Sequence, residues 1–375
     1  MKDGWEYKKL GEVATLYDSQ RKPVTKKDRK NGIYPYYGAS GIQDYVDNYI
    51  FDGRYLLVGE DGAKWGANDK TAFIVEGKIW VNNHAHIMTF DDSVKDRFVE
   101  YYLVGKDLNE YITGAVVPKL TQASLSKIPI PIPPLAEQER IVAELDLLSS
   151  IIDKKKAQLK ELDQLAQSIF YNMFGDPITN EKGWEVIQLG SKCEVSSFKR
   201  VLIEDVVDEG VPFIRGTELM TLSKGEKTSF TLFITQEHYE KVKNISGVPK
   251  IGDLLIPSIN ANGCIWILDT EEPRYYKDGR VLWVHVDEKS YSSQALKFIM
   301  HSLIKNTYSS VASGATFAEL KLFVLRELNT ILPPLPLQQE FASKIEAIER
   351  QKSLIQQSIV ETQTLFDSRM DHWFG

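Results

Sequence analysis

The sequence predicts an α+β protein, in which two tandem strand-rich domains are separated by two long antiparallel coiled-coil helices in a pseudo-two-fold arrangement. Three observations predict this fold. The chain repeats itself, each copy ends in a long apolar heptad pattern, and the middle of each copy is rich in β-forming residues and glycine. The expected division of the 375 residues is a first strand-rich domain at 1–134, a first helix at 135–175, a second strand-rich domain at 176–334 and a second helix at 335–375.

The repeat matches at the start and at the end of each copy. The offset is 179 near the start and 200 near the end, and the middle of the second copy is 21 residues longer. The matches include Trp5-Glu6 with Trp184-Glu185, Gly114-Ala115 with Gly314-Ala315, Pro133-Pro134-Leu135 with Pro333-Pro334-Leu335, Gln138 with Gln338, and Phe174-Gly175 with Phe374-Gly375. Segments that do the same job twice keep the same residues, whereas a segment that contacts a different ligand in each copy must differ. The halves therefore indicate one module used twice with a changed binding surface.

A long helix is expected after each double proline, because proline is tolerated at the start of a helix but not inside it. Both segments carry apolar residues at the a and d positions of one heptad frame, interrupted at Lys155, Lys352, Thr362 and Arg369. The residues expected to form the seam between the helices are Leu145, Leu148, Ile152, Leu159, Leu162, Ile169, Ile345, Ile348, Ile355, Ile359 and Phe366. A helix of about 38 residues is roughly 55–60 Å long. The alternative is that these are ordinary bundle helices packing on their own domains.

The middle of each copy has short runs of β-forming residues separated by glycine, followed by a helical pattern at 96–113 in the first copy and 291–305 in the second. Two loops between predicted strands occupy equivalent places, 59–66 and 257–263. The first carries Lys64 and Trp65, and the second carries Asn260 and Asn262. Lysine can contact a phosphate or a guanine edge, an aromatic ring can stack or wedge, and asparagine can pair with adenine. The alternative is that both loops are simple turns.

Basic residues gather at several points of a chain whose net charge is −7. The acidic total argues against DNA binding, although one contact face can still be basic. The candidate DNA-contacting residues are Arg21, Lys22, Lys26 and Lys27 in the first copy, and Lys199, Arg200, Arg215, Lys224 and Lys227 in the second. Solvated basic loops are the alternative for both sets.

Motifs for catalysis and for cofactor binding are missing. The sequence has no glycine-rich cofactor loop with an Asn/Asp-Pro-Pro-aromatic tetrapeptide, and no phosphate-binding Gly-x-x-x-x-Gly-Lys-Ser/Thr loop. His84 and His86 could ligate a metal, but no third ligand is evident. Two cysteines are too few for a disulfide framework, and no apolar run of 18 residues or signal peptide is present. We therefore expect a cytoplasmic protein with no catalytic residue, metal or cofactor of its own.

The residues that repeat also carry a family resemblance. The opening Gly4-Trp5-Glu6…Leu10-Gly11-Glu12-Val13 and the block from Thr113 to Ile141, with its Pro133-Pro134-Leu135-Ala136-Glu137-Gln138, resemble HsdS-type DNA specificity subunits of Type I restriction–modification enzymes. The resemblance covers the whole chain. The second copy departs from the block, because Pro336-Leu337-Gln338-Gln339-Glu340 stands where the first has Ala-Glu-Gln-Glu-Arg.

The resemblance implies a division of labour. Each domain would be a target-recognition domain that reads one half of a bipartite, asymmetric site in the major groove of double-stranded DNA. The helices would set the spacer and dock two methyltransferase subunits, which use S-adenosylmethionine, and two ATP- and Mg²⁺-dependent restriction subunits would join them. Two other hypotheses remain open: a tandem adaptor that binds protein or glycan, which the acidic charge favours, and a self-contained nuclease.

Overall fold

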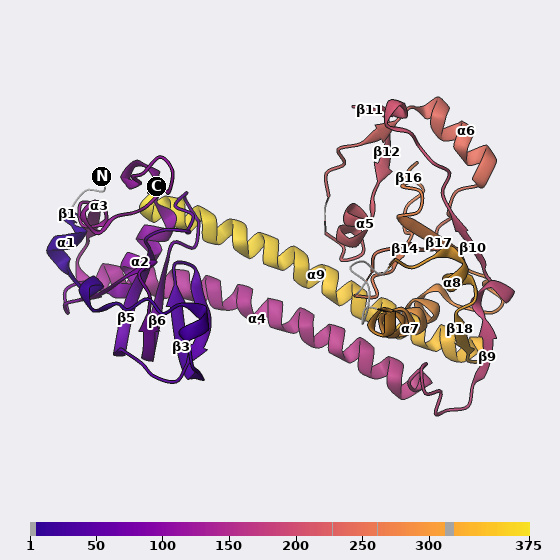
Figure 1. Ribbon diagram of the computed structural model, residues 1–375, viewed down its shortest axis with the longest axis horizontal. Coiled ribbons are helices and arrows are strands. Elements are labelled where there is room, and N and C mark those ends of the chain that lie inside the picture. The colour runs from indigo at the N-terminus through magenta and orange to yellow at the C-terminus, as the bar shows by residue number, and fades with distance from the viewer. Residues whose placement is uncertain (1–4, 227, 261, 312–318) are drawn as a thin grey trace. The chain divides into compact units, whose positions relative to one another are not determined.

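The computed structural model describes residues 5–226, 228–260, 262–311 and 319–375, so the Gly314-Ala315 repeat and Lys227 lie outside the described residues. The chain divides into two compact units. Unit 1 is Met1–Ala157 with Ile355–Gly375, and unit 2 is Gln158–Leu354. Two long helices, α4 (Leu135–Phe174) and α9 (Leu335–Phe374), each contribute one end to each unit (Figure 1). Both helices begin directly after a double proline, as the sequence predicts.

Unit 1 is built on one six-stranded sheet in the order β2-β7-β5-β6-β3-β4. Its elements are β1 (Glu6–Lys9), α1 (Leu10–Val13), β2 (Ala14–Leu16), β3 (Asn31–Gly38), β4 (Gly41–Val46), β5 (Phe51–Gly59), β6 (Ala72–Val81), β7 (Ala85–Phe90), α2 (Asp96–Gly105), α3 (Gln122–Leu125) and β8 (Pro129–Ile132). Alternate residues of β5 enter cores on opposite faces of the sheet: Leu56 and Val58 pack with α2 and α4, and Leu57 packs with the β6 and β7 residues of the other face.

Helix α2 ends at Gly105, so the prediction of a helix over 96–113 is too long by eight residues. Lys106 has extended backbone angles, and residues 109–111 form only a short 3₁₀ turn. A side chain at position 105 would meet the Met370 side chain of α9 at 2.9 Å, so glycine permits this close approach. The helical pattern at 108–113 reflects burial of Leu108 rather than a continuing helix.

Unit 2 has the same strand frame with additions. Its elements are β9 (Glu185–Gln188), β10 (Glu194–Ser197), β11 (Val206–Val207), β12 (Val211–Ile214), α5 (Gly216–Leu222), β13 (Phe233–Ile234), α6 (Gln236–Ser246), β14 (Leu254–Pro257), β15 (Trp266–Ile267), β16 (Tyr275–Tyr276), β17 (Val281–His285), α7 (Ser293–Val311), α8 (Leu322–Arg326) and β18 (Asn329–Leu332). The predicted helix at 291–305 is therefore α7, which begins two residues later and continues to Val311.

The strand order shows how the two middles correspond. The order β10-β17-β14-β15 of unit 2 repeats β2-β7-β5-β6 of unit 1. Strand β12 pairs in parallel with β16, just as β3 pairs in parallel with β6. Two short strands of unit 2, β15 and β16, thus take the place of the single strand β6. Between β12 and β14, unit 2 has α5 and α6, which unit 1 lacks.

A buried glutamine at the start of each long helix ties that helix to its own unit. Gln138 is fully buried; its amide donates to the carbonyls of Ser93 (3.0 Å) and Pro133 (2.9 Å) and accepts from the backbone N–H of Lys95 (2.9 Å). The repeated residue, Gln338, makes the same three bonds in unit 2, to Ser290, Pro333 and Ser292 (2.8–3.0 Å). We call each set the glutamine clamp. It joins the start of α4 to the start of α2, and the start of α9 to the start of α7.

Within each unit, α4 and α9 run antiparallel, and the interruptions of the heptad pattern make polar contacts between them. In unit 1, Lys155 donates to Ser358 Oγ (2.6 Å) and Thr362 Oγ1 (2.9 Å), and Arg369 pairs with Glu144. In unit 2, Lys352 pairs with Asp163 at 2.8 Å. The four interrupting residues therefore lie at the helix–helix contact together with the apolar ones.

The predicted seam residues occupy buried or half-buried positions on the two helices. Leu145, Ile152, Ile345 and Ile348 are buried. Several cluster with the strand domains: Leu145 with the unit 1 core, and Ile345 and Ile348 with the unit 2 core. The helices thus pack on their own domains as well as on each other. Among the described residues, no helix is both long and apolar enough to cross a membrane.

The glutamine clamp leads to a stability prediction. Gln138→Ala and Gln338→Ala should each lower the free energy of unfolding by about 3 kcal/mol. The buried carbonyl of Pro133 or Pro333 and two further backbone groups would lose their hydrogen-bond partner. Denaturant unfolding followed by circular dichroism measures this change. Gln164→Ala, at an exposed position of α4, is the matched control and should change stability by less than about 0.5 kcal/mol. Equal effects of the clamp and control variants would contradict the assigned role.

Candidate nucleic-acid interface

The two loops that the sequence analysis singled out occupy equivalent places in their units. The loop between β5 and β6 is anchored where the N–H of Leu120 donates to the carbonyl of Glu60 at 2.8 Å. The loop between β14 and β15 is anchored in the same way, from Leu320 to Ser258 at 2.7 Å. Because both donors belong to the repeated block before the long helix, that block holds each loop in place.

Lys64 and Trp65 are neighbours in the first loop but have different surroundings. Lys64 is exposed, and no ion pair joins it to another described residue. Trp65 is only 8% exposed; its indole N–H donates to the Gly59 carbonyl (3.2 Å), and its own carbonyl accepts from Leu108. The ring packs into the unit 1 core, so it anchors the loop and has little surface for stacking on a base.

The asparagines of the second loop also separate into a buried and an exposed residue. Asn260 is 1% exposed, accepts from the Cys264 N–H (2.6 Å) and donates to the Cys264 carbonyl (2.7 Å). Both ends of its amide are used to close the loop, so Asn260 has a structural role. Asn262 is exposed at the loop tip and keeps the orientation freedom that pairing with a base requires.

The basic segment at 21–30 also contains one arginine held inside unit 1 and several exposed lysines. The Arg21 guanidinium, 12% exposed, pairs with Glu60 (2.9 Å) and Asp18 (3.3 Å) and donates to the Ala85 carbonyl (2.7 Å). These groups engage its charge inside unit 1, so it is poorly placed to contact a phosphate. Lys22, Lys26 and Lys27 are exposed and make no ion pair with the other described residues.

His84 and His86 do not form a common metal site, because each pairs with a different carboxylate. His86 is fully buried against Asp18, and His84 contacts Asp61. Burial alone would raise the pKa of Asp61, but hydrogen bonds from Lys119 and His84 outweigh it and lower that pKa. Sequence reasoning missed both carboxylates, since they come from distant segments.

Within the described residues, Asp18, Glu60 and His86 form the one group of three side chains close enough to share a metal, with ligand atoms within 4.8 Å of one another. The Arg21 guanidinium already lies between the two carboxylates. A resident cation of this kind supplies the positive charge that a metal would bring. The arrangement is therefore an internal ion-pair network that joins the 18–21 segment to the loop after β5.

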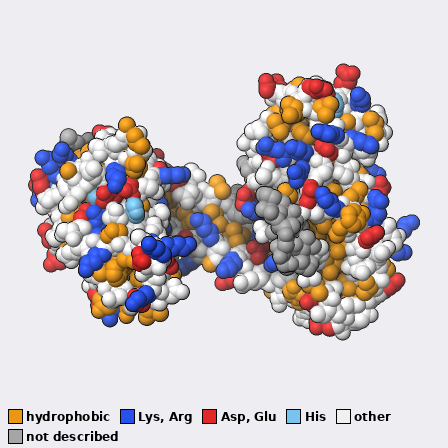
Figure 2. Space-filling model, in the orientation of Figure 1, with side chains coloured by type: hydrophobic (Ala, Val, Ile, Leu, Met, Phe, Trp, Pro, Cys, Tyr) orange, Lys and Arg blue, Asp and Glu red, His pale blue; other side chains and the backbone are white. Residues whose placement is uncertain are grey.

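In unit 2 the basic candidates lie at three places. Lys199 and Arg200 are exposed after β10, and Lys224 is exposed just after α5. Arg215, at the start of α5, is engaged by Glu218, and this hydrogen-bonded pairing raises the pKa of the guanidinium. Figure 2 shows Lys and Arg side chains on the visible face of each unit, interspersed with acidic ones. On this face the basic side chains of the described residues stand as separate points among acidic and neutral ones.

Comparison with known proteins places this arrangement in a class. Residues 2–164 match the family model described as Type I restriction modification DNA specificity domain. The chain is 31% identical, over 92% of its own length and 87% of the relative's, to S.HindORF215P of Haemophilus influenzae, described as a type I restriction enzyme specificity subunit. It is 21% identical, over 92% and 86% of the two lengths, to the MjaVIII specificity subunit of Methanocaldococcus jannaschii.

Two solved structures share the fold. One is the Type-I restriction-modification S subunit from M. genitalium, with a TM-score of 0.60 and 12% identity over 98% of this chain and 95% of that one. The other comes from a study of complex assembly in a type I R-M system, with a TM-score of 0.54 and 16% identity over 100% and 98%. The chain belongs to the type I restriction enzyme specificity subunit family. It is a sequence-recognition subunit of the non-catalytic kind, as the resemblance implied.

The different surroundings of Arg21 and the neighbouring lysines lead to a prediction. Arg21→Gln should lower the free energy of unfolding by about 3 kcal/mol, because it leaves two half-buried or buried carboxylates without their cation. The triple variant of Lys22, Lys26 and Lys27 to Gln should change stability by less than about 0.5 kcal/mol but flatten the salt dependence of binding to duplex DNA. Urea unfolding and salt-titrated DNA binding measure the two effects, and the reverse pattern would contradict the assignment.

Proposed function

We propose that each unit reads one half of a bipartite, asymmetric DNA site through the major groove. One observation carries the proposal: the two units repeat a single strand frame, glutamine clamp and loop anchor, yet differ in the loops that this frame presents. A frame of fixed geometry with exchangeable loops suits two different half-sites of one duplex. In functional terms the recognition domains are 1–134 and 176–334, and the helical segments are 135–175 and 335–375.

The candidate base- and phosphate-contacting groups are the exposed members of the predicted set. They are Lys22, Lys26, Lys27 and Lys64 in the first domain and Lys199, Arg200, Lys224 and Asn262 in the second. The lysines and the arginine would contact phosphate or guanine, and Asn262 has the amide that pairs with adenine. The buried residues of the set hold the loops and the ion-pair network in shape behind this surface.

The partners follow from membership of the family. We propose that two methyltransferase subunits dock on the helical segments and that two restriction subunits join them. S-adenosylmethionine would be bound by the methyltransferases, and ATP and Mg²⁺ by the restriction subunits, with no cofactor held by this chain. Because such a complex acts on the DNA of the cell, we place it in the cytoplasm.

A methylation experiment tests the proposal. When the chain is co-expressed with its cognate methyltransferase subunit, sequencing of the host DNA should find methylated adenines at one bipartite motif. Grafting the β14–β15 loop, residues 258–265, from a family member with a different target should change only one half of that motif. A stable complex that methylates no motif, or a graft that alters both halves, would count against separate recognition by the two units.

We further propose that the helices set the spacer between the half-sites. Residues 152–158 of α4 and 355–361 of α9 lie opposite one another, as the Lys155 contacts indicate. Deleting both heptads removes about 10 Å of helix while nearly preserving the helical phase, so the spacer should shorten by about 3 base pairs with unchanged half-sites. Alanine substitutions at the exposed positions of the same heptads are the control. A spacer of unchanged length would refute this part of the proposal.

A further inference from the structure

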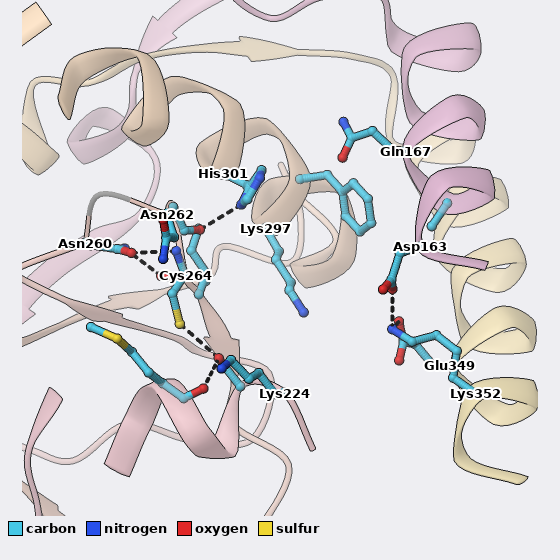
Figure 3. A pocket seen from close by; sticks show the side chains of 16 residues that line it. Asp163, Gln167, Lys224, Asn260, Asn262, Cys264, Lys297, His301, Glu349 and Lys352 are labelled. Atoms are coloured by element: carbon cyan, nitrogen blue, oxygen red, sulfur yellow. Dashed lines mark hydrogen bonds and ion pairs between the residues drawn. The ribbon is translucent and has the colours of Figure 1, made fainter. Parts of the chain in front are cut away.

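Unit 2 contains a cavity of about 390 Å³ beside the loop that follows β14. It is lined by the first half of α7, the end of α5, loop residues 260 and 262–265, and the adjoining stretches of α4 and α9, all within unit 2 (Figure 3). Its volume falls within the range of small-molecule sites, which is larger than a bare inorganic anion needs. Its polar lining, described next, decides which chemistry it suits.

Lys297 projects from α7 into this cavity without a partner. In Figure 3 its ammonium group ends in the space between the loop and the two long helices. No hydrogen bond or ion pair joins it to the other described residues, and burial lowers the pKa of its amine, with Glu349 opposing that effect only in part. Lys297 is half-buried, and a partly desolvated ammonium group that has gained no acceptor is costly, because a buried charge normally has a partner.

The acidic groups of the cavity are already engaged elsewhere. Lys352 bridges Asp163 (2.8 Å) and Glu349 (3.0 Å) across the helix pair, so these carboxylates share a cation. Lys224, on the opposite wall, is exposed and makes no ion pair with described residues. The three lysine ammonium groups of the cavity therefore outnumber its two carboxylates by one, and neither Lys297 nor Lys224 makes an ion pair with either carboxylate.

In unit 1 the residue at the position equivalent to Lys297 has an ion-pair partner within the unit, whereas Lys297 has none among the described residues. In each glutamine clamp one backbone N–H donates to the glutamine, that of Lys95 in unit 1 and that of Ser292 in unit 2. Five residues after these donors stand Glu100 of α2 and Lys297 of α7, which therefore occupy equivalent positions. Glu100 pairs with Arg97 at 2.8 Å, and Arg97 also reaches Asp146 of α4 at 2.8 Å. Unit 1 thus supplies its own counter-charges, whereas unit 2 leaves the position open.

Neutral groups of the cavity add hydrogen-bonding capacity. His301 Nδ1 lies 2.8 Å from the Gly263 carbonyl, which can only accept, so Nδ1 carries the proton and the ring is held in one orientation. The Cys264 thiol contacts the Ser223 hydroxyl at 2.9 Å and is not aimed at the open space. Asn262 is exposed at the rim, where its amide can donate.

We propose that this cavity binds a phosphate-bearing anion, with Lys297 and Lys224 as its charged contacts and Asn262 as a neutral donor. Lysine ammonium groups bind phosphate as point charges, and a ligand that enters supplies the counter-charge that unit 2 lacks. The phosphate can belong to a free nucleotide-sized molecule or to the DNA backbone, because both present the same chemistry. With a free ligand the site is independent of the proposed function; with a DNA phosphate it rests on that function, because Lys224 and Asn262 are also candidate DNA contacts.

Chemical labelling of the full chain tests the site directly. Acetic anhydride at limiting concentration acetylates accessible amines, and mass spectrometry gives the rate at each lysine. Inorganic pyrophosphate at about ten times its dissociation constant should slow the acetylation of Lys297 and Lys224 about tenfold, because only the free fraction reacts. Lys241, an exposed residue of α6 outside the cavity, is the internal control and should react at an unchanged rate.

A second arm with a duplex oligonucleotide identifies the source of the phosphate. Protection by pyrophosphate alone supports a free small ligand. Protection by the duplex, together with displacement of a fluorescently labelled duplex by pyrophosphate in an anisotropy competition, supports a backbone phosphate at the same site. If neither probe protects Lys297 more than Lys241, the proposal is overturned. The methylation test of the proposed function can fail or succeed independently of these outcomes.

Single substitutions give a check by affinity. Lys297→Met keeps the length of the side chain and removes its charge, and it should weaken pyrophosphate binding, measured by calorimetry, about tenfold. Lys224→Met, at an exposed position that folding tolerates, should have an effect in the same direction, and Lys241→Met should have none. If Lys297→Met does not fold, Lys224→Met and the labelling of the unsubstituted chain decide the question. Unchanged affinity in both cavity variants would overturn the proposal.

Discussion

A fully buried glutamine at the first turn of each long helix is the constraint on which each unit depends. Its amide has two donors and one acceptor, and all are used by backbone groups at the starts of two helices. The clamp fixes where the long helix leaves its strand domain. The repeated block before the helix also anchors the loop after β5 through Leu120, or the loop after β14 through Leu320. Because these contacts are made by backbone groups and one repeated side chain, the loop sequences can vary without loss of the frame. This explains why the ends of the two copies match while their middles diverge.

The two units share that frame but differ in their strands, their insertions and the pairing of their charged side chains. Unit 1 has a continuous strand β6, and its half-buried Arg21 and Arg97 pair with Glu60 and Asp146. Unit 2 splits the same strand into β15 and β16, inserts α5 and α6, and leaves Lys297 facing a cavity. An insertion before β14 supplies one wall of that cavity, at Lys224, so the added length of the second copy creates a place where a ligand can enter.

The sequence was sufficient for the fold and for part of the candidate site. Heptad spacing and the double prolines located α4 and α9 to within a residue, because helix periodicity and proline chemistry act locally. The correspondence of the two loops was also predictable from their flanking strands. Burial of Trp65, Asn260 and Arg21 was not. Glu60 is distant from Arg21 in the sequence, and the loops that hold Trp65 and Asn260 are closed only when Leu120 and Leu320 donate to them. The predicted helix at 96–113 was too long for a similar reason, because the close approach of Met370 to Gly105 is a tertiary contact. Little in the sequence singled out Lys297 beyond its position between the apolar residues Leu296 and Phe298.

The polar contacts along the helix pair also determine which chains can combine. If two copies of the first half associated through α4 in the same register, Lys155 would face Gln158 and Leu162 instead of Ser358 and Thr362, and Glu144 would face Ile169 instead of Arg369. Two copies of the second half would bring Arg369 against Lys344. Each self-pairing leaves a charge opposed by an apolar or a like-charged group. The interruptions of the heptad pattern thus discriminate against symmetric assembly from two identical halves.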